Sequence, residues 1–217
     1  MSFFFVFLKC VRPQNPDEIA VFNIEINEQP IDICSVGVHP WLTANAGMDD
    51  GYIDKCIEQL RSKCLMLGVV AIGEVGLDTM RGANIELQTK LFRQIVALSE
   101  EIRKPLIIHQ VKSIEALMQI RKETKAQQRW IVHGYRNKVE QARQLMQHGI
   151  ELSFGKHFNE AAIRLAFEND MMWLETDASS VGIQDVYQLA ATTLGVEEDF
   201  LKEYLYRKAV ELLSLSE

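Results

Sequence analysis

Short apolar runs alternate with amphipathic helical patterns along almost the whole of this 217-residue chain. The runs are rich in β-branched residues, which is typical of strands that are buried on both faces of a parallel sheet. An alternation of such strands with helices indicates repeated βα units. We interpret these runs as strands in series: 3–8, 31–38, 69–72, 106–108, 130–132, 150–154 and 171–175.

The segments between these runs carry helical periodicity. The clearest is 85–104, where leucine and isoleucine recur at intervals of three and four residues until Pro105 stops the helix. Asn159 stands where a helix N-cap is expected, and Gly149 stands where a helix C-cap is expected. The other predicted helices cover 52–64, 114–123, 139–147, 159–168, 186–194 and 199–213.

These patterns predict a TIM-type (β/α) barrel, distorted or incomplete, formed by a single domain of residues 1–217. An eighth strand in the series is not visible, and the run 20–26 fits either an extra strand or an extended crossover. A doubly wound open sheet is the alternative, because it is built from the same βα units. No linker, low-complexity tract or repeat divides the chain.

The composition suits one globular domain, with 47% hydrophobic and 24% charged residues. The formal net charge of −7 argues against broad electrostatic binding to nucleic acid or to anionic membranes. It does not exclude a polyanionic substrate, because a metal ion in a cleft can reverse the local electrostatic field.

The cysteines show no CxxC spacing, and two of them, Cys10 and Cys34, lie in strand-like apolar runs. This usage is typical of buried, reduced thiols in a cytosolic protein. The first residues carry no charged region ahead of a signal-peptide core, and no segment approaches the length of a membrane span. We therefore expect a cytoplasmic protein that does not bind membranes.

Several of the apolar runs end in side chains that can bind a metal ion. Because the carboxyl ends of parallel barrel strands open on one face, such side chains can converge although they are far apart in the sequence. Imidazoles together with carboxylates suit zinc, manganese or magnesium, and a carboxylate that bridges two ions is a usual device for hydrolysing phosphate esters. The residues at these strand ends are His39, Glu74, His109, His133 and Asp177.

A single histidine at a strand end is more often structural than a ligand. Here three of the five histidines occupy strand ends beside two carboxylates, and this coincidence favours a site. His148 precedes Gly149 and fits a role at a helix end. His157 lies in a loop two residues past Gly155, from which it can approach the site.

Three further residues have two interpretations each. Lys112, three residues beyond His109, is either a phosphate contact or the solvated start of the next helix. Trp41 and Tyr135 each follow a strand-end histidine by two residues, and either wall a substrate pocket or pack on the barrel rim.

Five segments of the chain form an ordered set of motifs: Gly37-Val38-His39-Pro40-Trp41, Gly73-Glu74-Val75-Gly76-Leu77-Asp78, Pro105 to His109, His133-Gly134 and Glu175-Thr176-Asp177. From about residue 31 to its end, the chain resembles the TatD family of metal-dependent hydrolases. Each motif alone is weak evidence for this resemblance, whereas the five motifs in this order are specific.

The resemblance implies a TIM-type barrel and divalent-metal phosphodiester hydrolysis, usually described as deoxyribonuclease activity. It implies that Glu74 bridges two metal ions, that His109 and His133 hold one of them, and that Asp177 serves the other and orients the attacking water. It also implies that His39 lies near the substrate phosphate rather than among the metal ligands.

One departure from the family pattern concerns the first strand, where such enzymes normally carry His-x-His. Here that strand ends Leu8-Lys9-Cys10-Val11-Arg12, so that Lys9 and Val11 occupy the two histidine positions. Valine cannot ligate a metal and an ammonium repels one. We therefore expect half of the family's metal site to be missing.

The chain thus has one leading functional hypothesis and two alternatives. The first is a TatD-like phosphodiesterase acting on DNA or a small phosphodiester with one or two Zn, Mg or Mn ions, in which Glu74, His109 and His133 leave room for water. The second is an impaired relative that binds a nucleotide or a protein partner. The third keeps the barrel for other hydrolase chemistry, on an amide or a lactone, because a fold alone does not fix the reaction.

Overall fold

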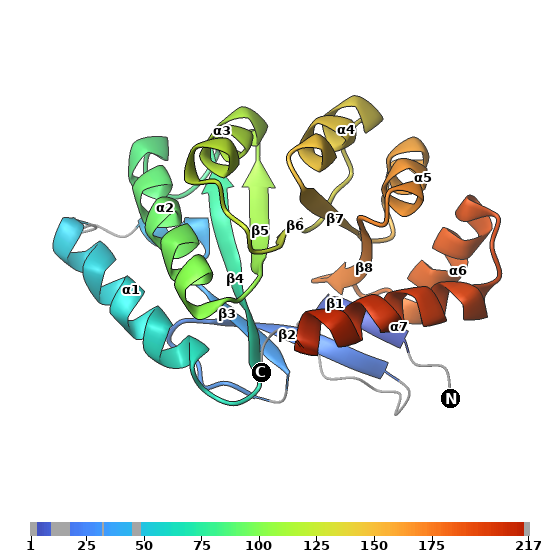
Figure 1. Ribbon diagram of the computed structural model, residues 1–217, viewed down its shortest axis with the longest axis horizontal. Helices are drawn as coiled ribbons and strands as arrows, with labels where there is room; N and C mark the ends of the chain where they lie inside the picture. The colour runs from blue at the N-terminus through green and yellow to red at the C-terminus, as the bar shows by residue number, and fades with distance from the viewer. Residues whose placement is uncertain (1–3, 10–17, 32, 45–48, 215–217) are drawn as a thin grey trace. The chain divides into compact units, whose positions relative to one another are not determined.

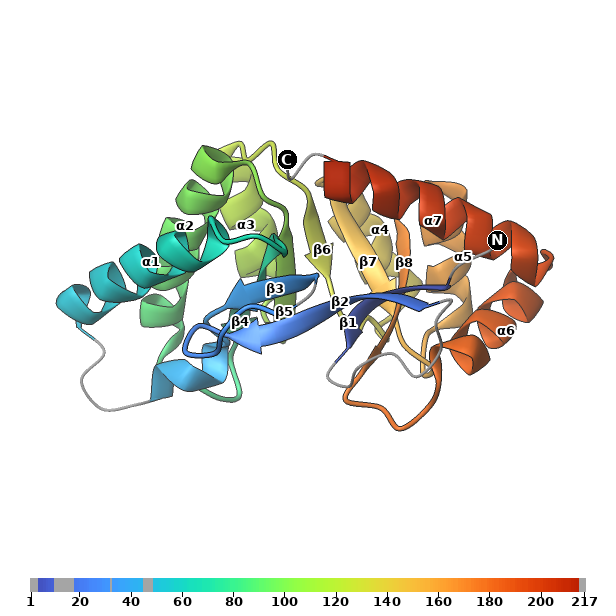
Figure 2. The same ribbon diagram turned by 90° about the horizontal axis from the view of Figure 1, so that it is seen from below.

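The computed structural model of the protein describes residues 4–9, 18–31, 33–44 and 49–214 (Figures 1 and 2). The strands are β1 (Phe4–Lys9), β2 (Glu18–Glu25), β3 (Cys34–Gly37), β4 (Val69–Asp78), β5 (Leu106–Val111), β6 (Trp130–Val132), β7 (Ile150–Phe154) and β8 (Met172–Asp177). The helices are η1 (Pro40–Ala44), α1 (Asp50–Cys64), α2 (Ile85–Ile102), α3 (Ile114–Thr124), α4 (Val139–Gln147), α5 (Glu160–Glu168), α6 (Ile183–Leu194) and α7 (Glu198–Ser214).

The run 20–26, for which the sequence left two interpretations, forms the strand β2. Its first residues pair in parallel with β1, with Glu18 beside Phe4 and Ala20 beside Val6. The extra strand is therefore confirmed and completes a set of eight among the described residues, and the extended crossover is excluded. The loop residues 10–17 that join the two strands lie outside the described part of the chain.

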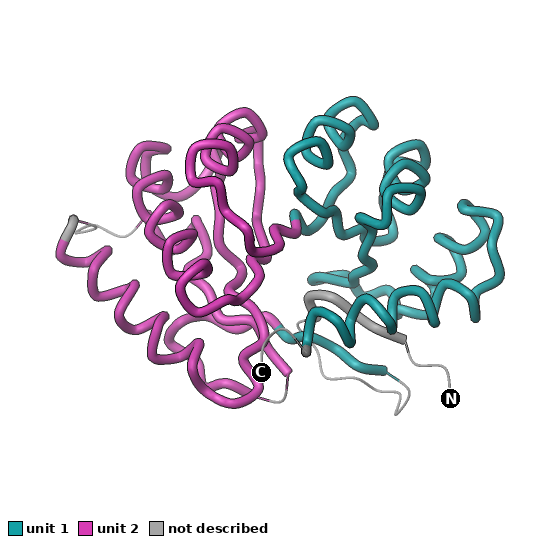
Figure 3. Tube along the Cα trace, viewed as in Figure 1, with its two compact units in different colours: residues 1–22, 132–217 teal, residues 23–131 magenta. Residues whose placement is uncertain are grey.

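The chain divides into two compact units (Figure 3): unit 1 comprises residues 1–22 and 132–217, and unit 2 comprises residues 23–131. In unit 2, β4 lies between β3 and β5 and pairs in parallel with both. All ten residues of β4 are buried. Helices α1 and α2 contact β4, and α3 contacts β5. Because β4 is buried along its whole length, both of its faces accept apolar side chains, and its apolar run shows no alternation with polar residues.

β4 continues beyond the end predicted from its apolar run. Gly76, Leu77 and Asp78 pair with residues 109–111 of β5, so the strand ends at Asp78. Glu74 therefore lies inside β4 rather than in a loop after it, and β5 likewise extends beyond His109. Hydrophobicity marks only the apolar part of a strand, whereas these ends are defined by backbone pairing with the neighbouring strand.

Close packing of β3 against β4 depends on Gly37. A Cβ atom at this position would overlap the carbonyl oxygen of Glu74. Gly37 therefore allows the end of β3 to approach the backbone that carries Glu74.

In unit 1, β8 lies between β7 and β1 and pairs in parallel with both (Figure 2). On the β1 side Glu175 lies beside Phe7, and Asp177 lies beside Lys9. Helices α6 and α7 contact β1, α6 and α5 contact β8, and α4 contacts β7. The largest fully buried side chains of this unit include Phe154, Trp173 and Tyr187.

The local signals for helices hold in the structure. Asn159 is the N-cap of α5, and its side chain accepts a hydrogen bond from the N–H of Ala162. The C-cap of α4 is His148, one residue before the predicted Gly149, which follows it with a left-handed φ of 68°. None of the described helices is both long and apolar enough to cross a bilayer.

Three of the cysteines are buried free thiols, namely Cys34, Cys56 and Cys64, whereas Cys10 lies outside the described residues. Burial raises the pKa of Cys64 to about 12, so that this thiol stays protonated at neutral pH.

Candidate functional site

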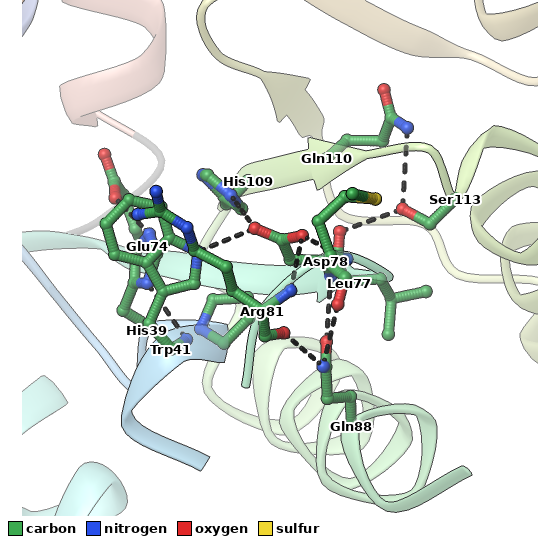
Figure 4. Close-up of polar contacts among 12 residues, drawn as sticks. His39, Trp41, Glu74, Leu77, Asp78, Arg81, Gln88, His109, Gln110 and Ser113 are labelled. Atoms are coloured by element: carbon green, nitrogen blue, oxygen red, sulfur yellow. Dashed lines mark hydrogen bonds and ion pairs between the residues drawn. The ribbon is translucent and has the colours of Figure 1, made fainter. Parts of the chain in front are cut away.

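Three predicted site residues of unit 2, His39, Glu74 and His109, lie together (Figure 4). Each offers one ligand atom, and these atoms all lie within 4.8 Å of one another. His39 follows β3, Glu74 lies in the middle of β4, and His109 lies in β5. Because the three strands are neighbours and parallel, residues far apart in the sequence share one end of this strand group.

The hydrogen bonds of His39 fix its tautomer. Its Nδ1 accepts from the backbone N–H of Trp41 at 3.2 Å, so Nε2 carries the ring proton in the neutral imidazole. Nε2 lies 3.2 Å from Oε2 of Glu74. In this arrangement His39 donates to Glu74 and orients its carboxylate, which favours a supporting role for His39 over a ligand role.

His109 is held by a carboxylate that the sequence interpretation gave no role. Its Nε2 lies 3.2 Å from Oδ2 of Asp78, whose side chain is 2% exposed. Since a carboxylate accepts, Nε2 is the protonated nitrogen of His109 and Nδ1 carries the lone pair. Metal-binding histidines commonly donate their second ring N–H to a carboxylate in this way.

Asp78 is surrounded by donors. Trp41 Nε1 donates to Oδ2 at 2.6 Å, and the backbone N–H groups of Met80 and Arg81 donate to Oδ1 at 2.8 and 3.1 Å. Burial alone would raise the pKa of Asp78, but the hydrogen bonds from Trp41, Met80 and His109 outweigh it and hold the pKa below its ordinary value. Asp78 is therefore ionised at neutral pH and accepts from His109.

The loop after Asp78 is fixed by Gln88 of α2, which is 1% exposed. Gln88 Oε1 accepts from the N–H of Asp78, and its Nε2 donates to the carbonyl groups of Asp78, Arg81 and Ala83. These bonds hold Arg81, whose guanidinium lies 4.3 Å from the centre of the Trp41 ring. Trp41 itself packs edge-on against His39 and His109, so it forms one wall of the cluster.

Unit 1 contains a second, looser pair of this kind. His133 Nδ1 lies 3.8 Å from Oε1 of Glu175, which is beyond hydrogen-bond distance. Glu175 is 1% exposed and accepts from the N–H of Gly134 at 2.8 Å. His133 and Asp177 each offer a ligand atom within 4.8 Å of the other. Asp177 ends β8 with a left-handed φ of 46°, a conformation found more often at functional sites.

Asp78 and Glu175 are the two residues that the sequence interpretation missed. Asp78 lies four residues after Glu74 in one strand, and Glu175 lies two residues before Asp177 in another. Even spacing places two side chains on the same face of a strand. That spacing is the signal that could have identified both carboxylates.

The other candidate residues have the following places. Lys112 is exposed after β5 with a φ of 50°, and His148 bonds to the carbonyl of Gln144 at the end of α4. Tyr135 and His157 line a cavity in unit 1 that Asp177 also lines. The side chain of Lys9 and the whole of Val11 lie outside the described residues.

The cluster in unit 2 fits a divalent metal ion. The carboxylate of Glu74 and the imidazole of His109 are donors that zinc, manganese and related ions accept, and His39 lies where it orients that carboxylate. The side chains of His39, Glu74 and His109 are 17%, 10% and 13% exposed. This partial exposure leaves access for water, as in catalytic rather than structural metal sites.

Comparison with known families gives one match over most of the chain. A family model described as "TatD related DNase" matches residues 9–180. Among curated proteins, the uncharacterized metal-dependent hydrolase YabD of Bacillus subtilis is 35% identical over 117 residues, which are 50% of this chain and 46% of YabD. The uncharacterized metal-dependent hydrolase MJ1582 of Methanocaldococcus jannaschii is 26% identical over 148 residues, 67% of this chain and 56% of that protein.

The chain therefore spans about half the length of these curated relatives.

Solved structures match this chain over a larger share of its length. The TatD homologue YJJV of Escherichia coli has a TM-score of 0.72 at 19% identity, covering 89% of this chain and 86% of that one. A TatD family hydrolase of Entamoeba histolytica has a TM-score of 0.69 at 19% identity, covering 83% and 74%. This likeness confirms the predicted fold class, a TIM-type (β/α) barrel.

Proposed function

Because the chain belongs to the TatD-related DNase family, we propose that it is a metal-dependent hydrolase that cleaves phosphodiester bonds, with DNA or a small phosphodiester as substrate. The observation that carries this proposal is the cluster of His39, Glu74 and His109, whose ligand atoms lie within 4.8 Å of one another. The hydrogen bond between His109 and Asp78 supports it, because metal-binding histidines commonly donate one ring N–H to a carboxylate.

The proposed metal ligands are Glu74, His109, His133 and Asp177. A bound Zn, Mg or Mn ion would supply a Lewis acid for the phosphoryl oxygens and a nucleophile at neutral pH. Among the chain's own groups, Glu74 and Asp177 are the proposed catalytic carboxylates, with Asp177 orienting the attacking water. His39 and Lys112 are proposed to contact the substrate phosphate.

A second candidate function follows from the first strand. The backbone register of β1 and β8 places Lys9 beside Asp177. A lysine at a position where the family carries a metal-binding histidine brings a positive charge in place of that ligand, and a positive charge can compensate the charge that a second metal ion otherwise balances. The second candidate is therefore an impaired relative that binds a nucleotide or a protein partner.

Metal content and cleavage, measured on the same purified sample, separate the two candidates. We expect one ion per chain after equilibration with excess manganese or zinc, and hydrolysis of bis-p-nitrophenyl phosphate and of DNA. The variant Glu74→Gln should lose at least tenfold in both metal affinity and rate. Glu58→Gln, which changes an exposed glutamate of α1, should match the parent. A Glu74→Gln protein that retains metal and rate would contradict the proposed site, and metal binding without cleavage would favour the second candidate.

The double change Lys9→His with Val11→His tests the missing ligands. Two imidazoles in the family's positions should raise the metal content toward two ions per chain and increase the rate of hydrolysis. Elemental analysis of parent and variant decides the matter. Two ions already bound to the parent would mean that other residues complete the second site.

The chain is also proposed to act as a single barrel domain in the cytoplasm. The buried free thiols Cys34, Cys56 and Cys64 support this location.

A further inference from the structure

Unit 1 contains a cavity of about 340 Å³ that the proposed chemistry does not fully use. This volume is in the range of small-molecule binding sites. The lining includes Arg136, Lys156 and His157, of which Lys156 is half-buried and the other two are exposed. None of these three side chains has a hydrogen bond or an ion pair with another residue in the described part of the chain.

The loops that carry these side chains are anchored. Tyr135, next to Arg136, donates its backbone N–H to the carbonyl of Ser153 in β7, and its hydroxyl donates to the carbonyl of Lys138. Lys156 and His157 lie in the short connection between β7 and the N-cap residue Asn159. Anchoring at both ends limits the conformational entropy that ligand binding would remove.

The floor of the cavity is acidic. It includes Asp177 and Glu175, and Glu175 Oε2 is buried with no hydrogen-bond partner among the residues described. An anion would be repelled from this floor and attracted to the cationic side chains of Arg136 and Lys156. A buried carboxylate oxygen without a donor is costly, so a hydroxyl group of a ligand would stabilise it.

Ser179 and Ser180 complete the lining near the end of β8. Ser179 is fixed in a turn, since its N–H donates to the carbonyl of Thr176 and its Oγ accepts from the N–H of Val181. Ser180 has no hydrogen bond to another described residue, so its hydroxyl can donate to an anion. The cavity thus combines donors for a phosphate group with an acceptor for a hydroxyl.

We propose that this cavity binds a second phosphate group of the substrate, distinct from the one that is hydrolysed, through Arg136, Lys156 and His157. A hydroxyl of the adjoining sugar contacts Glu175. The inference rests on the proposed function, because Asp177, a proposed metal ligand, lines the same cavity. It identifies the substrate class as a phosphorylated end of a nucleotide chain rather than an isolated phosphodiester.

Binding of two matched probes to the full, metal-loaded chain tests this inference. Thymidine 3′,5′-bisphosphate has one phosphate more than thymidine 5′-monophosphate, and neither contains a diester bond. We expect isothermal titration calorimetry to show at least tenfold tighter binding of the bisphosphate. Arg136→Gln and Lys156→Gln should each reduce this preference about fivefold. Arg164→Gln, which changes an exposed arginine of α5 outside the cavity lining, should leave it unchanged.

Equal affinities for the two probes in the parent would overturn the inference. It would also fail if Arg164→Gln lowered the preference as much as Arg136→Gln, because the effect would then be one of net charge. The proposed function is tested separately by cleavage of bis-p-nitrophenyl phosphate, which has a single phosphate. A protein that cleaves this compound but shows no preference for the bisphosphate would refute the cavity assignment alone.

Discussion

At the scale of single residues, two histidines each lie beside a buried carboxylate: His109 beside Asp78, and His133 beside Glu175. The hydrogen bonds that the two carboxylates accept are different. Asp78 receives hydrogen bonds from Trp41 and from two backbone N–H groups in addition to its contact with His109. Buried charge is tolerated when it is hydrogen-bonded in this way. Glu175 accepts from the N–H of Gly134 at 2.8 Å and lies 3.8 Å from Nδ1 of His133.

The variant Asp78→Asn tests the role of this carboxylate. An amide fills the same volume but removes the negative charge that favours the Nε2-protonated tautomer of His109. We expect the affinity for manganese to fall roughly 10- to 100-fold, as for other partners of metal-binding histidines. Asp54→Asn, at an exposed position of α1, is the matched control. Equal manganese affinities of the parent and Asp78→Asn, measured by calorimetry, would show that Asp78 is only structural.

The sequence identified His39, Glu74 and His109 as candidates because each follows an apolar run. It gave no role to Asp78 or Glu175, because the importance of a carboxylate inside a strand depends on which side chain the neighbouring strand places against it. The register between the two strands determines that partner. A hydrophobic pattern indicates which face of a strand is buried, but it does not identify the residue opposite on the neighbouring strand.

At the scale of elements, periodicity predicted the helices well and the strand ends poorly. The predicted helix 139–147 has the bounds of α4, and 85–104 differs from α2 by two residues at its end. By contrast, β4 extends six residues past its apolar run, to Asp78. Helices are defined by local hydrogen bonds, whereas the end of a strand depends on a partner that is distant in the sequence.

The approach of β3 to β4 provides a test at this scale. In Gly37→Ala, the new methyl group would overlap the carbonyl oxygen of Glu74. We expect a loss of about 1–3 kcal/mol in the free energy of unfolding, together with weaker metal binding, because the backbone of Glu74 must move. Urea unfolding followed by circular dichroism measures the first effect.

Gly51→Ala is the control for that experiment. Gly51 lies in the first turn of α1, where an added Cβ would meet only Asp49 Oδ1, at 3.5 Å. This change should stabilise the protein by about 0.5–1 kcal/mol, the difference in helix propensity between glycine and alanine. If both alanine variants had the same urea midpoint as the parent, the close approach at Gly37 would make no contribution to the free energy of unfolding.

At the scale of the whole molecule, the fold class was predictable because alternating strands and helices leave few topologies open. The number of metal ions was not predictable to the same degree. It depends on Lys9 and Val11, where this chain departs from the family's pattern, and their side chains lie outside the described residues. The net charge of −7 acts over the entire surface, so attraction of a nucleic acid depends on a few local cations.

The last prediction concerns this dependence on local cations. Binding of single-stranded DNA should involve Lys112 and the cavity residues Arg136, Lys156 and His157, and thus about three to four phosphates. For single strands, the logarithm of the binding constant falls with the logarithm of salt concentration with a slope of about −0.7 per phosphate, here about −2 to −3. Raising the salt from 50 to 200 mM should therefore weaken binding about 20- to 50-fold.

Fluorescence anisotropy with a labelled oligonucleotide measures this slope, and Glu74→Gln as the background prevents cleavage during the titration. Adding Arg136→Gln should make the slope shallower by about 0.7, because one phosphate contact is lost. Adding Arg164→Gln should leave the slope as it was. Tight binding that persists in high salt would contradict this account, since it would require base stacking or a larger basic surface than an acidic chain with 23 basic and 30 acidic residues provides.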